Sequence, residues 1–172
     1  MGKAKTKSGS QKFYNKHDDQ MREFFAKAQR EYASGAAKPQ VGEDGSSRIV
    51  LCDGLWRYVD LWYGGEPYSG MTTLFYEEVA CWSMVYWGRI MPYAEDKQLV
   101  LAALMDALQH NHNPDQPFRG PRKMITSTGL RYINEAKGGL RCFSGTERIV
   151  GHLRKDEVLY YASYTGGVVN KD

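Results

Sequence analysis

The residues best placed to do chemistry lie in a predicted strand over residues 56–63, where side chains alternate between two faces. Trp56, Tyr58, Asp60 and Trp62 share one of these faces, so a carboxylate stands among three aromatic rings. Burial of an unpaired carboxylate is costly, so the group must be paired with a cation or lie in a cleft. The pattern therefore predicts either a structural ion pair or a ligand-facing acid at Asp60.

Arginine partners for this carboxylate must come from other segments, because Arg57 points to the opposite face of the same strand. The two candidates are Arg89, which follows a later predicted strand, and Arg119, which stands in a turn between two prolines. A guanidinium held by a stiff loop suits recognition of a carboxylate or phosphate. It equally suits bracing of the connector, and both interpretations stay open for Arg119.

Aromatic residues concentrate in the same part of the chain, and all four tryptophans lie between residues 56 and 87. Rings on both faces of a strand indicate that one face packs against a helix. A surplus of rings on the other face can line a pocket for a flat ligand. The predicted ligand-facing residues are Trp56, Tyr58, Asp60, Trp62, Arg89, Arg119 and Glu147.

Enzymatic use of these groups is the first alternative, with Asp60 or Glu147 as general acid or base on a small polar substrate. The sequence contains no GxSxG elbow, no Walker lysine loop and no HExxH motif. Cys52, Cys81 and Cys142 are far apart and form no CxxC pair, which favours free buried thiols over a zinc site. Catalytic residues are therefore left unassigned, and neither a cofactor nor a metal is expected.

The first predicted helix runs from Asp18 or Asp19 to about Ala33, with an apolar stripe at helical spacing. Strands are expected at 48–52, 56–63, 72–76 and 79–87. The last two form a hairpin around Glu77 and Glu78. This pair suits a type I′ turn poorly, so a longer loop is the alternative.

Asp96 is expected to cap a second helix that ends near His110. The connector over 111–121 holds three prolines and is expected to be irregular. Strands then return at 124–128, 130–135, 146–153 and 157–165. Each set of strands therefore follows one helix.

The two sets of strands also resemble each other in sequence. Arg-Tyr-Val-Asp at 57–60 recurs as Arg-Tyr-Ile-Asn at 131–134, and Tyr-Ser-Gly at 68–70 recurs as Phe-Ser-Gly at 143–145. The pattern predicts the α+β class with two pseudo-repeated halves, about 18–91 and 96–168, each a helix followed by a twisted antiparallel β-meander. Chance similarity between aromatic strands is the alternative.

Charge divides the chain into a basic end and a nearly neutral body. Residues 1–17 contain five lysines and no acidic residue, whereas the remainder carries a net charge of −2. The interpretation is a disordered basic tail over 1–17 and a single α+β domain over 18–172. Neither specific nucleic-acid binding nor a membrane span is expected, and the predicted location is the cytoplasm.

Several blocks resemble a bacterial domain of unknown function that follows a Cro-type helix-turn-helix in some transcriptional regulators. The blocks are Trp-Arg-Tyr with Asp60, Gly-Gly at 64–65, Trp-Ser-Met-Val-Tyr-Trp-Gly-Arg at 82–89, Pro-Phe-Arg-Gly-Pro at 117–121, Phe-Ser-Gly-Thr-Glu at 143–147, and Gly-Gly at 166–167. The resemblance implies no activity. Thr72 stands where it implies an acid, Thr165 stands where it implies a histidine, and the segment before Asp18 is too short for the helix-turn-helix.

The function predicted from these features is a binding or sensory module with an aromatic-lined cleft for a small molecule or a protein partner. The second alternative, after the enzyme, is a structural or homodimeric interaction domain. The three hypotheses differ in what contacts the aromatic face and Asp60 in the folded protein.

Overall fold

The computed structural model describes residues 9–111, 119–151 and 157–169. The first part contains α1 (Gly9–Ala33), β1 (Gln40–Val41), β2 (Ser46–Asp53), β3 (Trp56–Gly64), β4 (Tyr68–Tyr76) and β5 (Val79–Ile90). The second part contains α2 (Lys97–Gln109), β6 (Lys123–Ile125), β7 (Arg131–Gly139), β8 (Cys142–Val150) and β9 (Val158–Val168). The predicted α+β class is confirmed. Most of the expected irregular connector, residues 112–118, lies outside the described residues.

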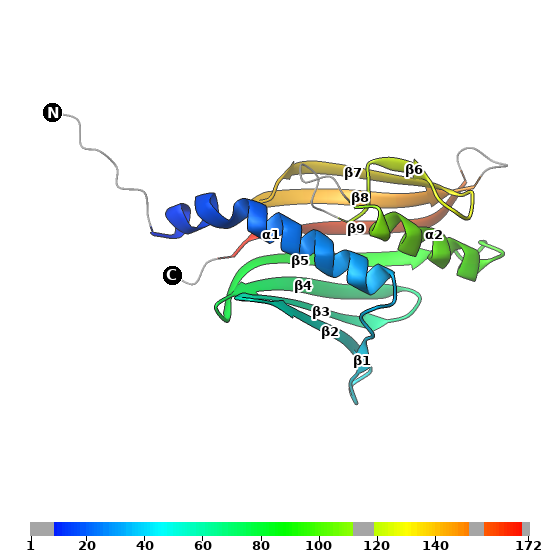
Figure 1. Ribbon diagram of the computed structural model, residues 1–172. Helices are drawn as coiled ribbons and strands as arrows, with labels where there is room; N and C mark the ends of the chain where they lie inside the picture. Colours follow the sequence, from blue (N-terminus) through cyan, green and yellow to red (C-terminus); the bar gives the residue numbers. More distant parts are fainter. Residues whose placement is uncertain (1–8, 112–118, 152–156, 170–172) are drawn as a thin grey trace.

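All nine strands form one antiparallel sheet in the order β1-β2-β3-β4-β5-β9-β8-β7-β6. Strands β5 and β9 pair in the middle, where Tyr86 lies opposite Tyr164. Counted outward from this centre, β4, β3 and β2 occupy the positions that β8, β7 and β6 occupy on the other side. Both helices lie on the same face of the sheet and leave the opposite face uncovered (Figure 1).

Helix α1 begins nine residues earlier than the predicted cap at Asp18, since it starts at Gly9. The residues between contain neither proline nor a run of β-branched side chains, so nothing in the sequence stops the helix there. Residues 9–17 of the predicted basic tail are therefore helical, and residues 1–8 lie outside the described part. The apolar stripe holds as predicted, with Met21, Phe24, Phe25 and Ala28 buried.

Helix α2 begins as predicted, because the side chain of Asp96 accepts a hydrogen bond from the backbone N–H of Leu99 at 2.9 Å. Its buried face carries Val100, Ala103, Leu104, Ala107 and Leu108. Within the described ranges, neither helix combines the length and the apolar character needed to cross a bilayer.

The hairpin between β4 and β5 turns more tightly than its sequence suggests. Glu77 and Glu78 have φ angles of 47° and 63°, the left-handed conformation of a two-residue turn. Tyr76 pairs with Val79, so the predicted hairpin around this pair is confirmed and the alternative of a longer loop is not found. The backbone N–H of Glu77 donates to the carbonyl of Leu55 at 3.0 Å, and Glu78 pairs with Arg57 at 2.7 Å. These contacts with the neighbouring hairpin hold two residues that disfavour the turn on their own.

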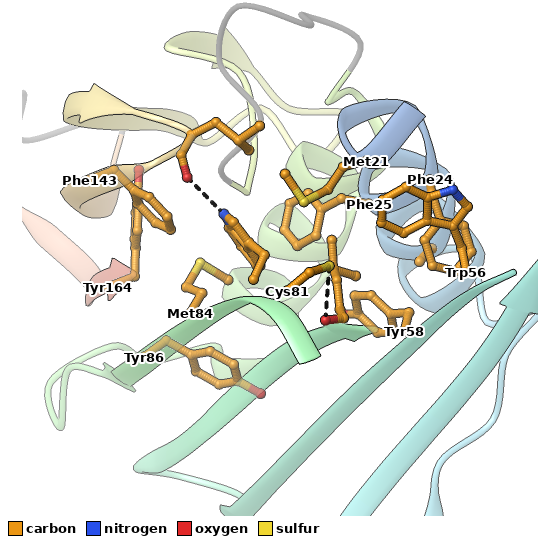
Figure 2. Packing of buried hydrophobic residues seen from close by; sticks show 14 of the residues in the cluster. Met21, Phe24, Phe25, Trp56, Tyr58, Cys81, Met84, Tyr86, Phe143 and Tyr164 are labelled. Atoms are coloured by element: carbon orange, nitrogen blue, oxygen red, sulfur yellow. Dashed lines mark hydrogen bonds between the residues drawn. The ribbon is translucent and has the colours of Figure 1, made fainter. Parts of the chain in front are cut away.

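The larger core cluster lies between α1 and the sheet, where Phe25 of the helix faces Tyr58 and Cys81 of the strands (Figure 2). Trp82 belongs to this cluster and is 1% exposed. The indole of Trp82 stacks on Phe143 with ring centroids 5.4 Å apart, and its N–H donates to the carbonyl of Leu140 at 3.0 Å. A second cluster packs α2 against β7, β8 and β9. The helices meet where Gln109 donates to the carbonyl of Ala33 at 3.0 Å.

Candidate functional site

A cavity of about 370 Å³ lies between the two helices and the covered face of the sheet. Helix α1 contributes Gln29 and Tyr32, and α2 contributes an apolar wall that includes Leu101, Leu104 and Met105. The sheet contributes Asp60 and Thr72, and Arg119 enters from the segment before β6. Six aromatic rings line the cavity: Tyr32, Tyr58, Trp62, Tyr68, Tyr86 and Tyr160.

Asp60 is the buried acid of this cavity, and the residue is only 6% exposed. One carboxylate oxygen, Oδ1, accepts hydrogen bonds from the hydroxyls of Thr72 at 2.8 Å and Tyr86 at 2.9 Å. The other oxygen, Oδ2, accepts none from the described residues and is not fully enclosed by protein. Burial raises the pKa of Asp60 to about 6, against the opposing effect of the two hydroxyls and of Arg119. The carboxylate of this cavity-lining residue therefore has one oxygen without a hydrogen-bond donor among the described residues.

Strand register explains how these groups meet. Thr72 on β4 is the direct cross-strand neighbour of Asp60 on β3. Tyr86 on β5 is opposite Gly70, and a Cβ at Gly70 would lie 2.5 Å from the Tyr86 hydroxyl. The glycine thus leaves the space through which the tyrosine reaches across β4 to Asp60.

The matching positions on the other side of the sheet hold a different set of groups. There Asn134 on β7 is the cross-strand neighbour of Glu147 on β8. Tyr164 on β9 reaches across Gly145 and donates to the Asn134 side-chain oxygen at 2.6 Å. The acid therefore stands on the outer strand, β3, on one side of the sheet and on the inner strand, β8, on the other.

Glu147 is fully buried and is paired with Arg119, whose Nε donates to Glu147 Oε2 at 2.5 Å. The hydroxyl of Tyr132 donates to the other oxygen, Oε1, and the hydroxyl of Tyr160 lies 3.5 Å from Oε2. Burial, followed by the charge of Glu147, raises the pKa of Tyr132 well above its ordinary value. Both oxygens of Glu147 are engaged inside the protein.

Arg119 owes its position to an unusual backbone. Its φ of 64° lies in the left-handed region, which is uncommon for a residue with a side chain. The next residue, Gly120, is held on both sides: its N–H donates to the Tyr132 hydroxyl at 3.1 Å, and its carbonyl accepts from Asn134 at 2.9 Å. These bonds fix the turn that directs the guanidinium toward Glu147 and the cavity.

The structure brings four of the seven predicted ligand-facing residues to the cavity, namely Tyr58, Asp60, Trp62 and Arg119. The other three lie elsewhere. Trp56 is buried beneath α1 with its ring 6.1 Å from that of Phe24. Side chains along β5 point alternately to the two faces of the sheet, and Arg89 comes three residues after the buried Tyr86. Arg89 therefore lies on the uncovered face. Glu147 lies behind Arg119 and does not line the cavity.

Several residues that line the cavity were not predicted from the sequence to do so. Tyr32 was predicted only as part of the apolar stripe of α1, and Leu101 and Met105 of α2 carried no prediction. Tyr86 had a usable signal, because it faces the same side of the sheet as Asp60 and lies opposite a glycine. Burial and the charge of Asp60 raise the pKa of Tyr32 to about 12, so its hydroxyl stays protonated near neutral pH.

The cysteines contribute nothing to the cavity. Only Cys81 is buried, where burial raises its pKa to about 12, and the prediction of buried thiols is wrong for the exposed Cys52 and Cys142. Among the described residues, no cluster of three or more His, Cys, Asp or Glu side chains could hold a metal ion.

These features define an α+β domain in which two helices cover one face of a single sheet. The helices and the sheet enclose a cavity that is lined by aromatic rings and a few polar groups. Residues 60–169 match the sequence model of the family described as Domain of unknown function (DUF5680). The chain therefore belongs to this family. Comparisons with curated proteins and with solved structures gave no match.

Proposed function

We propose that this protein is a small-molecule binding module that takes its ligand in the cavity between the helices and the sheet. The observation that carries the proposal is a buried carboxylate with one unpartnered oxygen in a space of about 370 Å³ lined by aromatic rings. A volume of this size accommodates small ligands of up to drug-like dimensions. A few polar groups among apolar walls are the usual composition of such sites.

A sensory role is supported by the elements that form the cavity walls. Both helices and strands of both sides of the sheet contribute, so a bound molecule would contact elements far apart in the chain. Binding would add a link between α1 and α2 to the hydrogen bond that Gln109 donates to the carbonyl of Ala33. The resemblance to a domain that follows a helix-turn-helix in some regulators supports the same role.

General acid or base catalysis is the second candidate, and one observation favours it. A carboxyl group with a pKa of about 6 can take up and release a proton near neutral pH. Of the two acids considered, Asp60 has the free oxygen that such a role requires. Glu147 is enclosed and paired with Arg119, which suits a structural role.

We also propose that the two sides of the sheet arose by duplication of one unit. Support comes from the mirrored strand order and from the central pairing of Tyr86 with Tyr164. In addition, the side chain of each tyrosine crosses a glycine of the next strand and reaches the strand beyond it. On this account one unit kept its carboxylate open to a ligand, and the other enclosed its carboxylate with Arg119.

A protein partner, the remaining alternative, would meet the uncovered face of the sheet. Exposed apolar side chains on that face include Val50, Met71, Val85 and Trp87. Nothing on the face selects one partner over another, so it supports an alternative and not the main proposal.

The test of the proposed function is whether small molecules perturb the cavity. A mixed set of small aromatic fragments is added to the labelled protein, and backbone amide shifts are recorded by NMR. Leu101→Trp places a larger ring at the cavity, whereas Leu99→Trp is the matched control, since both leucines are about two-fifths exposed on α2 and only Leu101 lines the cavity. We expect shifts at cavity residues that disappear in Leu101→Trp and persist in Leu99→Trp. Shifts confined to the uncovered face would contradict the proposal.

A further inference from the structure

We propose that the cavity selects an organic cation, a molecule with a protonated or quaternary nitrogen on a flat apolar body. This inference rests on the proposed function, because it names the chemical class of ligand for the same cavity. It follows from the charges around the cavity, the arrangement of the rings and the free oxygen of Asp60.

Among the residues that the structure describes, the buried charges at the cavity leave one negative charge without a counterpart. Arg119 and Glu147 form a pair at 2.5 Å, with side chains 8% and 0% exposed, so their charges offset each other. Asp60 is then the remaining buried charge, and its described partners are two neutral hydroxyls. Glu66 and Lys97, which are exposed and line the cavity, carry opposite charges and leave the net charge of the cavity unchanged. A ligand with one positive charge would balance the site.

The free oxygen supplies the specific contact. Oδ2 of Asp60 can accept one hydrogen bond from an ammonium or protonated ring nitrogen, and such charge-assisted bonds are about twice as strong as neutral ones. An anionic ligand would meet the same oxygen and be repelled. Arg119 also lines the cavity, but its charge is already offset by Glu147 at 2.5 Å, and its guanidinium lies 5.2 Å from the centre of the Tyr86 ring.

The rings add a second attraction for cations. Tyr32 and Trp62 have centroids 5.7 Å apart with planes inclined at 56°, and Tyr68 and Tyr86 have centroids 6.0 Å apart at 62°. The faces of aromatic rings carry negative potential and attract cations, as in sites for quaternary ammonium groups, and these four residues line the cavity. The Tyr86 ring already lies 5.2 Å from the Arg119 guanidinium, so Tyr32 and Trp62 are the pair left for a ligand. Apolar side chains of α2, including Leu104 and Met105, provide the surface for the body of the ligand.

The test compares three probes with the same ring and different charge: benzylammonium, benzyl alcohol and benzoate. Each is titrated into the full chain at pH 7.5, and the dissociation constant is taken from amide shifts of cavity residues. We expect benzylammonium to bind about tenfold or more tightly than benzyl alcohol, because only the cation makes a charge-assisted bond and cation–π contacts. Benzoate should bind more weakly than both.

Two controls separate charge from folding. Asp60→Asn should remove the preference for benzylammonium, whereas Asp53→Asn, which alters an exposed aspartate paired with Lys27, should retain it. If Asp60→Asn fails to fold, the wild-type protein provides the same information through pH. At pH 5 roughly one in ten Asp60 side chains with a pKa of about 6 stays ionised, so benzylammonium should bind about tenfold more weakly and benzyl alcohol about equally.

The outcomes distinguish this inference from the function on which it rests. Equal or tighter binding of benzyl alcohol or benzoate at the cavity would overturn the cation inference and leave the binding function standing. The same holds if all three probes are silent while other fragments shift the cavity amides. Silence of every fragment and probe at millimolar concentration would overturn both.

Discussion

Each side of the sheet buries one carboxylate, and the two carboxylates belong to corresponding cross-strand pairs, Asp60 with Thr72 and Asn134 with Glu147. Their hydrogen-bond and charge partners differ. Asp60 has hydroxyl partners on one oxygen and a free second oxygen at the cavity. Glu147 is engaged at both oxygens, by Arg119 and Tyr132. Similar depth of burial therefore produces a group available to a ligand in one place and a closed ion pair in the other. Partners, more than burial, separate the two roles.

The largest effect is expected from Glu147→Gln. The substitution keeps the shape of the side chain but leaves Arg119 charged, buried and without its carboxylate, which typically destabilises a protein by about 3–5 kcal/mol. Denaturant unfolding at pH 7.5 measures this change. Glu135→Gln is the matched control on the same side of the sheet, because its pair with Arg148 at 2.7 Å is largely exposed and should contribute less than about 1 kcal/mol. Equal effects of the two substitutions would remove the distinction between the two acids.

Asp60→Asn should have the opposite sign. A pKa raised from 3.8 to about 6 means that folding disfavours the ionised form by about 3 kcal/mol, so removing the charge should stabilise the protein by about 1–3 kcal/mol at pH 7.5. The same unfolding experiment measures it, with Asp53→Asn as the exposed control. A loss of stability as large as that of Glu147→Gln would show that Asp60 also serves as the partner of a buried cation.

The pH dependence of stability sharpens the same comparison. Because the folded pKa of Asp60 is higher than the unfolded value of 3.8, the folded state holds a proton between about pH 4 and 6 that the unfolded state releases. The contribution of this group is therefore fully present below pH 4 and is lost as the pH rises through 6. Unfolding free energies of wild type and Asp60→Asn should converge near pH 4 and separate by pH 7. Parallel curves over this range would contradict the raised pKa.

The smallest effect is expected from the two central tyrosines. Tyr164→Phe removes the 2.6 Å bond to Asn134 and should cost about 1 kcal/mol without changing the pKa of Asp60. Tyr86→Phe removes a donor that favours the ionised carboxylate, so it should raise the pKa of Asp60 further. Unfolding and a carboxyl titration measure the two quantities. A shift of the Asp60 pKa in Tyr164→Phe but not in Tyr86→Phe would contradict the assigned hydrogen bonds.

Features fixed by short-range pattern could be predicted from the sequence. Period-two alternation identified the face shared by Trp56, Tyr58 and Asp60, and helical spacing with Asp96 identified the start of α2. Features fixed by distant contacts could not. The left-handed turn at Glu77 depends on the carbonyl of Leu55, and the pairing of Arg119 with Glu147 joins residues 28 positions apart. The helical wall of the cavity was missed for the same reason, since helical periodicity does not reveal which edge of an apolar stripe borders an empty space.

The most direct test of the account is a titration of the Asp60 carboxyl carbon by NMR, in the free protein and with saturating benzylammonium. We expect a midpoint of about 6 in the free protein and a lower midpoint with the cation bound, because a neighbouring positive charge favours the carboxylate. A free midpoint close to 3.8 would mean that the carboxyl is solvated and not held in an apolar cavity. A midpoint near 6 that benzylammonium leaves unchanged would mean that the cation does not meet Asp60.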